Sequence, residues 1–129
     1  MSSCFYGFPI VAYISLALEN DKSAAFASVQ EYCRNTSVET DIFAEEILPE
    51  EKDRPLWQQV VDLVERSEVS MIVVPSLQHI AGKDSKSMSS FLTFLKINNV
   101  RLKSLAEGVD SQHDSHLKIL SRYNKEKNQ

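Results

Sequence analysis

The chain has 129 residues, of which 43% are hydrophobic and 25% are charged, as in an ordinary soluble globular protein. This length fits one domain with a hydrophobic core of its own. Glycine and proline are scarce, at 3 and 4 residues, which excludes disordered and collagen-like chains. The 18 acidic and 14 basic side chains give a formal net charge of −4, which argues against a protein whose main task is to bind nucleic acid.

The N-terminal region and the cysteines give little sign of export or of a redox site. No stretch approaches the roughly 18 consecutive apolar residues of a membrane span. The apolar start of the chain lacks the basic segment of a signal peptide. Cys4 and Cys33 have neither metal-ligand nor redox-motif spacing, which favours two free thiols. We therefore expect a cytoplasmic protein without a membrane partner, a metal or another cofactor.

Four apolar, β-branched segments are typical of strands that are buried in a parallel sheet. They comprise residues 10–16, 38–47, 69–74 and 100–105. Each is followed by a segment with helical spacing of its apolar residues. The expected helix starts are Asn20 or Asp21 for the first, Asp53 with Pro55 for the second, residues 82–84 for the third, and a position within 113–117 for the last. Gly108 and residues 110–111 are expected in a turn or cap.

Strand and helix therefore alternate four times, which predicts an α/β fold. We expect three layers, with a mainly parallel sheet of four to five strands between flanking helices. In such folds ligands and catalytic groups lie beyond the carboxyl ends of the strands. Those ends are residues 15–19, 44–48, 75–82 and 106–110.

The end of the first strand has no glycine-rich phosphate loop. The end of the second strand carries Glu45 and Glu46, followed by Glu50 and Glu51. Such carboxylates could hold a metal or act as general acid and base. We favour a solvated acidic patch, because consecutive acidic residues in a loop usually face water.

Histidines offer two further candidate sites. His79 is the histidine near the third strand end that could act as a general base, with Ser76 close in sequence. A surface or capping histidine is the interpretation that we favour. His113 and His116 lie three residues apart and could bind a metal from one helix face. Two histidines alone make a weak site, so we favour a solvated helix start.

Aromatic and basic residues could together form a surface for nucleic acid. Trp57, Phe91 and Phe94 recur at helical spacing and are expected in the core rather than as a stacking platform for bases. The one basic concentration could contact a phosphate backbone, although a solvated face is favoured. It consists of Lys83, Lys86, Lys96, Arg101 and Lys103.

Several segments match one protein family in order and spacing. Residues 13–17 read Tyr-Ile-Ser-Leu-Ala, where the family has Tyr-x-Arg-x-Ser. Residues 53–55 match its Asp-Arg-Pro, and residues 99–111 follow Gly-Val-x-Leu-x-Ser-x-x-Glu-x-x-Asp-Thr. Over residues 10–111 the chain thus resembles the N-terminal catalytic domain of serine recombinases, the resolvase/invertase family. The resemblance implies that catalytic-domain fold for residues 1–111.

The resemblance also implies a chemistry, in which a serine hydroxyl attacks a DNA phosphodiester and arginines neutralise the developing charge. The family's active-site positions are occupied here by Ser15, Ala17, Ala44, Arg54, Gln78, His79 and Gly82. Ala17 stands at the nucleophile position. Ser15, His79 and Gly82 stand where the family has arginines. Only Arg54 keeps the family's residue, and without an arginine cluster we do not expect Ser15 to replace the nucleophile.

In the family, a long helix after the Asp-Thr turn mediates dimerisation and leads to a DNA-binding domain. Here residues 112–129 are expected to form a short helix and a polar tail, without such a domain. Four apolar residues of this helix could pack on the domain or on a second copy, namely Leu117, Ile119, Leu120 and Tyr123. The candidate contacts to a DNA backbone are Arg54, Lys83, Lys86 and Arg101.

The sequence therefore predicts a recombinase-like domain that lacks the residues for strand cleavage. Our main hypothesis is a protein-interaction or regulatory module related to site-specific DNA recombination, which forms a homodimer or binds an active recombinase. The first alternative is a DNA-binding protein that does not cleave. The second is a small enzyme that uses His79 with the Glu45–Glu46 loop, although no small-molecule substrate is evident.

Overall fold

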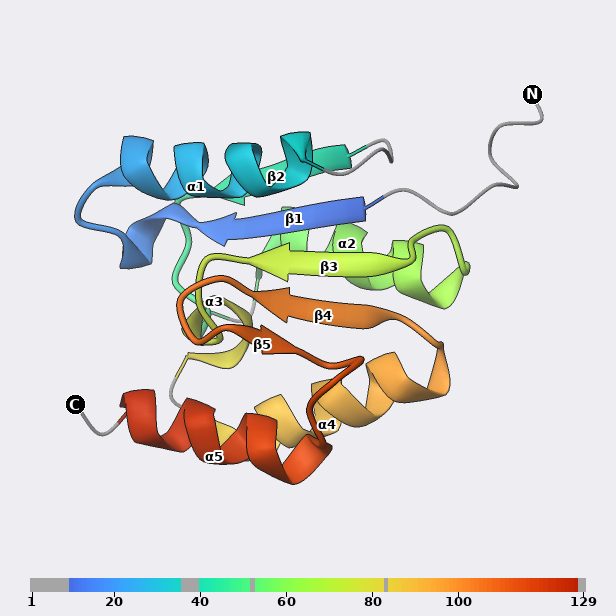
Figure 1. Ribbon diagram of the computed structural model, residues 1–129. Helices are drawn as coiled ribbons and strands as arrows, with labels where there is room; N and C mark the ends of the chain where they lie inside the picture. The colour runs from blue at the N-terminus through green and yellow to red at the C-terminus, as the bar shows by residue number, and fades with distance from the viewer. Residues whose placement is uncertain (1–9, 36–39, 52, 83, 128–129) are drawn as a thin grey trace.

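The computed structural model describes residues 10–35, 40–51, 53–82 and 84–127 (Figure 1). Five strands form one sheet in the order β2-β1-β3-β4-β5. They are β1 (Ile10–Ser15), β2 (Thr40–Glu45), β3 (Met71–Val74), β4 (Arg101–Ser104) and β5 (Val109–Asp110). The first four strands are parallel, and β5 runs antiparallel to β4. The expected α/β fold with a mainly parallel sheet is confirmed.

Helices cover both faces of this sheet. They are η2 (Leu16–Leu18, a single 3₁₀ turn), α1 (Lys22–Arg34), α2 (Pro55–Glu65), α3 (Gln78–Ala81), α4 (Ser85–Ile97) and α5 (His116–Lys127). Val29 of α1 packs into a cluster on one face. Val60 of α2, Leu92 of α4 and Ile119 of α5 pack into a larger cluster on the other. Figure 1 shows α1 beside β2 and β1, whereas α4 and α5 lie toward the opposite edge of the sheet, which β5 forms.

Strand β1 is buried along its whole length because it lies between β2 and β3 with a helical layer on each side. Its residues alternate between the two clusters, as the pleat of a strand requires. Val11 and Tyr13 belong to the larger cluster, and Ile10, Ala12 and Ile14 belong to the smaller one. This double burial explains why the segment reads as a continuous apolar run rather than an alternating one.

Two helix starts agree with the sequence. The Asp21 side chain accepts a hydrogen bond from the N–H of Ala24 at 3.0 Å and caps α1. Asp84 caps α4, because its Oδ1 accepts from the N–H groups of Lys86 and Ser87 at 3.1 Å each. In both cases a carboxylate satisfies main-chain donors that the first helical turn leaves free.

The start of α2 differs from the sequence prediction. Asp53 was the expected N-cap, but Arg54 occupies that position and its side chain makes no capping hydrogen bond. The N–H groups of Leu56 and Trp57 instead donate to the carboxylate of Glu45, each at 3.1 Å. The last residue of β2 therefore caps the helix from a distant place in the sequence, which local patterns do not reveal.

Besides the single turn η2, two short elements were not predicted. Residues 78–81 were expected in the loop after the third strand, but they form α3. Residues 109–110 were expected in a turn, but they form β5 against β4. Ser111 fixes this hairpin, because its Oγ accepts from the N–H of Leu102 at 2.8 Å and its own N–H donates to the Leu102 carbonyl at 2.9 Å.

Several residues of the 99–111 motif stabilise this hairpin. Asn99 has a φ of 59°, in the left-handed region that asparagine tolerates better than most residues. Arg101 and Asp110 form an ion pair at 2.8 Å across β4 and β5. The hydroxyl of Ser104 donates to the carboxylate of Glu107 in the loop between them. The polar residues of this segment therefore hold β4, β5 and their connection together.

Candidate active site

The carboxyl ends of β1 and β3 are adjacent at the centre of the sheet, where doubly wound folds place their ligands. Ala17 lies in η2, directly after β1, and is exposed. Ser15 is fully buried. Its Oγ donates to the carbonyl of Ile47 at 2.5 Å, and its N–H donates to Nδ1 of His79 at 2.8 Å. The Ser15 hydroxyl is thus engaged within the protein.

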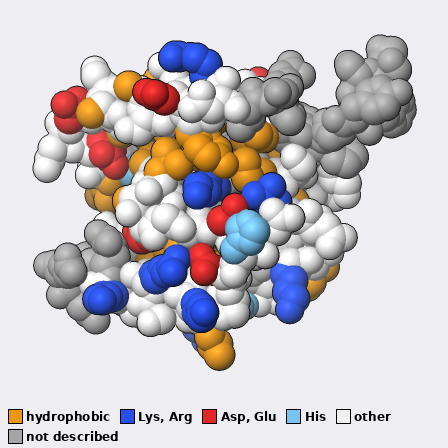
Figure 2. All heavy atoms as spheres, viewed as in Figure 1, with side chains coloured by type: hydrophobic (Ala, Val, Ile, Leu, Met, Phe, Trp, Pro, Cys, Tyr) orange, Lys and Arg blue, Asp and Glu red, His pale blue; other side chains and the backbone are white. Residues whose placement is uncertain are grey.

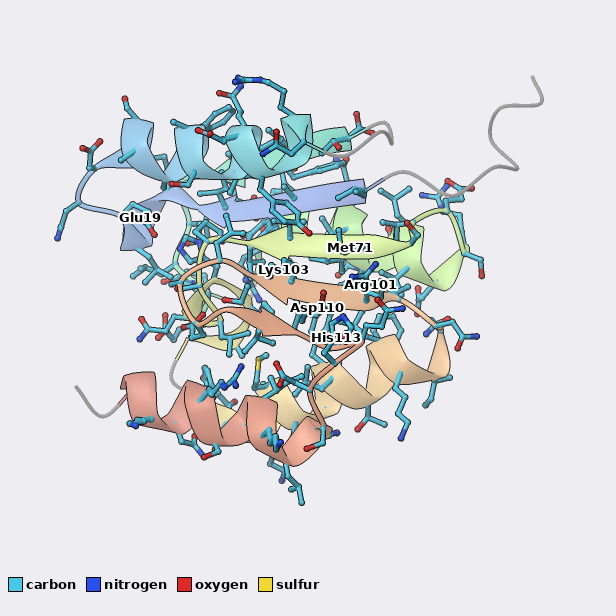
Figure 3. All side chains as sticks on the ribbon, viewed as in Figure 1. Glu19, Met71, Arg101, Lys103, Asp110 and His113 are labelled. Carbon is cyan, nitrogen blue, oxygen red and sulfur yellow. The ribbon has the colours of Figure 1, made fainter. Side chains whose placement is uncertain are left out.

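His79 lies in α3 and is fully buried, so the expected surface or capping position is wrong. Its Nε2 is 2.6 Å from a carboxylate oxygen of Glu19, which Figure 3 shows near the carboxyl end of β1. Because Nδ1 accepts from Ser15, the proton of the neutral ring sits on Nε2 and is donated to Glu19. Burial lowers the pKa of His79, against the opposing hydrogen bond and charge of Glu19.

Arg54 reaches the same region from the residue before α2. Its Nη2 donates to the carbonyl of Ile80 at 3.0 Å, and its Nη1 is 3.5 Å from the carbonyl oxygen of His79. The guanidinium carbon lies 4.9 Å from the centroid of the Trp57 ring and 5.9 Å from that of Tyr13. Cation–π contacts and main-chain acceptors therefore hold this arginine.

The glycine after α3 has a conformation that other residues rarely adopt. Gly82 has a φ of 60° and a ψ of −117°. A Cβ built there would lie 2.5 Å from Oε2 of Glu50. The Gly82 carbonyl accepts from the hydroxyl of Tyr123 at 2.5 Å. Gln78 and Ala44, which occupy two further active-site positions of the resemblance, are both half-buried. Gln78 is the first residue of α3, and Ala44 packs against the smaller core cluster.

Glu45 and Glu46 do not act as a pair. Glu45 is buried, caps α2 and accepts from the hydroxyl of Tyr13 at 2.6 Å. Burial and this hydrogen bond raise the pKa of Tyr13. Glu46 is exposed and forms an ion pair with Lys22 at 2.6 Å. The prediction of a solvated acidic patch is therefore confirmed for Glu46 and wrong for Glu45. His79 pairs with Glu19 and not with a carboxylate of this loop.

The basic candidates do not form one surface. Arg54 and Lys86 line a cavity of about 640 Å³ between α2 and α4, together with the acidic residues Glu50 and Asp84. Arg101 lines a separate cavity beside α5. Figure 2 shows basic side chains interspersed with acidic ones on the face that carries β4, β5 and α5. Lys83, like Cys4, lies outside the described residues.

The remaining candidates are aromatic residues, which line the same cavity as Arg54, and the two other histidines. Trp57, Phe91 and Phe94 are half-buried and pack against the larger core cluster, which confirms their expected place. Nε2 of His116 lies 3.2 Å from the hydroxyl of Ser89, and His113 is exposed. Over the described ranges, no three histidine, cysteine, aspartate or glutamate side chains gather as metal ligands. In the same ranges no helix is both long and apolar enough to cross a membrane.

A family model described as "Resolvase, N terminal domain" matches residues 17–125, which is most of the chain. The chain belongs to this family. The match begins at Ala17, so β1 and Ser15 precede it, and it ends within α5, at Lys125. A search of curated proteins found no match.

Two solved structures share the resolvase fold at low sequence identity. The N-terminal catalytic domain of TP901-1 integrase has a TM-score of 0.72 at 16% identity, covering 93% of this chain and 96% of that one. A resolvase family site-specific recombinase from Streptococcus pneumoniae has a TM-score of 0.66 at 18% identity, covering 94% and 88%. At these identities the likeness concerns the fold.

In this resolvase-family domain, α5 packs on the body of the protein. Ile119 is 2% exposed and Tyr123 is fully buried, and both belong to the larger core cluster. Leu120 is half-buried against that cluster, whereas Leu117 is 78% exposed. The contact of Ile119 and Tyr123 with the domain is thus one of the two packing modes that the sequence left open.

Sequence reasoning missed two carboxylates in this resolvase-family site. Glu19 follows the first strand in a loop for which the sequence shows only a lack of glycines, yet it pairs with His79. Glu107 was recognised as a motif residue, and the structure shows that its carboxylate accepts from the N–H of Leu77 at 3.2 Å, just before α3. Both contacts join residues far apart in the chain, so no local pattern could reveal them.

Proposed function

We propose that this resolvase-family domain does not cleave DNA and acts through contact with other proteins. The observation that carries the proposal is the end of β1, where exposed Ala17 holds the position that the resemblance assigns to the nucleophile. A methyl group has no lone pair with which to attack phosphorus. Two residues earlier, the hydroxyl of Ser15 is buried and donates to a main-chain carbonyl.

The surroundings of Ala17 support the same conclusion. Transfer of a phosphodiester needs positive groups that neutralise the charge of the transition state. Here His79 faces the carboxylate of Glu19, and Gly82 has no side chain. The retained arginine, Arg54, directs two nitrogens at main-chain carbonyls. A DNA phosphate at this edge would meet the negative charge of Glu19 without a matching set of guanidinium groups.

Incubation with supercoiled DNA, followed by denaturing electrophoresis, tests the absence of cleavage. We expect no covalent adduct with the wild-type protein. We also expect none with Ala17→Ser, which restores a hydroxyl but no arginines. An adduct in the wild type that disappears in Ser15→Ala would overturn the proposal.

The protein-contact part has its own test. Sedimentation measures self-association, and capture on an immobilised active serine recombinase measures binding to such a partner. The proposal expects self-association or recombinase binding. A strict monomer that binds no recombinase would contradict it.

Residual DNA binding is the second candidate, because Arg54 and Lys86 line one cavity. Glu50 and Asp84 balance their charge there, so we rank this function lower. A mobility shift that weakens steeply with salt would favour it over the protein-contact function.

A further inference from the structure

Helix α3 has only four residues and is held in place by side chains from elsewhere in the chain. Just before it, the N–H of Leu77 donates to Glu107. Near its end, the carbonyl of Ile80 accepts from the Arg54 side chain. Directly after it, the carbonyl of Gly82 accepts from the hydroxyl of Tyr123. A helix of this length does not persist by its own hydrogen bonds. Its position therefore depends on these tethers.

His79 is a further tether, and histidine is the side chain whose ordinary pKa lies nearest to neutral pH. With one proton on Nε2, the ring accepts from the N–H of Ser15 through Nδ1 and donates to Glu19 through Nε2. A second proton can enter the ring only at Nδ1. That nitrogen would then point a proton at the N–H of Ser15, and two donors would face each other at the present separation of 2.8 Å. Protonation of Glu19 instead leaves the Ser15 hydrogen bond in place.

We propose that His79 is an acid-sensitive latch, which holds α3 against the end of β1 in its neutral form and releases it when the ring takes a second proton. The latch goes beyond the proposed function and does not depend on it. Its neutral form accounts for both ring hydrogen bonds, and its protonated form breaks the one to Ser15.

Charged groups from several elements face this latch. Glu19, after η2, favours the protonated ring, because its carboxylate contacts Nε2. Arg54, before α2, places a positive charge beside the His79 carbonyl. Glu107, after β4, and Tyr123, on α5, contact the main chain on either side of α3. Burial lowers the pKa of His79 below its usual 6.5, so the neutral ring is the resident form at neutral pH.

Two substitutions separate the halves of the latch. In His79→Asn the side-chain oxygen can take the place of Nδ1, so the hydrogen bond from Ser15 is kept in a residue that does not titrate. In His79→Gln the amide nitrogen can take the place of Nε2, so the contact with Glu19 is kept and the one with Ser15 is lost. His113→Asn, at an exposed histidine, is the matched control.

Amide hydrogen exchange of the full chain tests the latch. From about pH 7.5 to about pH 5, we expect the protection factor of the Ser15 amide to fall roughly tenfold relative to that of Val73, a buried β3 amide. The ratio should stay constant in His79→Asn, be low at both pH values in His79→Gln, and change in His113→Asn as in the wild type.

A parallel loss of protection at Ser15 and Val73 would indicate global unfolding and would overturn the latch. An unchanged pH dependence in His79→Asn would also overturn it. If that variant does not fold, the ¹⁵N shifts of the His79 ring in the wild type decide the question. The latch requires the Nε2–H tautomer at neutral pH, and the Nδ1–H tautomer would refute it.

Discussion

Glu45 and Glu46 are neighbours in the sequence, but the structure gives them opposite importance for stability. Replacing Glu45 with alanine removes the carboxylate that accepts from Tyr13, Leu56 and Trp57. Replacing Glu46 removes only an ion pair with Lys22, in which both side chains are about half exposed, at 56% and 50%. The two substitutions therefore delete the same group from a buried and from a solvated site.

The expected loss for Glu45→Ala follows from the groups left behind. Tyr13 is fully buried, so its hydroxyl would remain without a partner, at a cost of about 1–3 kcal/mol. Loss of the α2 cap adds about 1 kcal/mol. We therefore expect the free energy of unfolding to fall by about 3 kcal/mol. For Glu46→Ala we expect a change within about 0.5 kcal/mol, as for other exposed ion pairs.

Urea denaturation, followed by the fluorescence of the single tryptophan, Trp57, measures both values. Far-UV circular dichroism gives an independent transition and tests whether unfolding is two-state. The reasoning is refuted if Glu45→Ala loses less than about 1 kcal/mol, or if Glu46→Ala loses as much as Glu45→Ala.

Three further predictions concern single groups. Burial raises the pKa of Tyr123 to about 12, so its hydroxyl keeps its proton and donates to the Gly82 carbonyl. Tyr123→Phe should therefore lower the free energy of unfolding by about 1 kcal/mol, measured by urea denaturation with Tyr32→Phe as the control. Gly82→Ala should cost about 1–3 kcal/mol in thermal unfolding, because a φ of 60° with a ψ of −117° lies outside the left-handed helical region that other residues reach. Gly108 also has a positive φ, of 67°, but a Cβ there meets nothing within 4 Å, so Gly108→Ala should cost less. The hydrogen bonds from the side chain and N–H of Ser87 lower the pKa of Asp84, so the stability from this cap is present above pH 3.8 and is lost as the pH falls through the lowered value. Acid titration followed by circular dichroism should show a shallower loss in Asp84→Asn, and an identical profile would contradict this account.

The fold was predictable because its signals are local. The buried strand β1 reads as a continuous apolar run, and Asp21 and Asp84 stand where helix caps belong. The four-residue α3 and the two-residue β5 were missed, because elements so short contain no complete period of apolar residues. Their existence depends on contacts with distant parts of the chain.

The candidate site was predictable only in outline. The resemblance located Ser15, Ala17 and His79 at the relevant strand ends, but it could not show that His79 is buried. Burial of a histidine depends on a partner, here Glu19, which lies 60 residues away in the sequence. Glu45 was misjudged for the same reason, since the donors that it satisfies belong to another element.

The tethers of α3 have a consequence for the order of folding. They connect residues separated by 64, 30, 26 and 41 positions, from Ser15, Glu107, Arg54 and Tyr123 respectively. Contacts between such distant residues form only after the intervening chain has been brought together. We therefore expect α3 to form after the transition state for folding, so that substitutions in its tethers accelerate unfolding and leave the folding rate nearly unchanged.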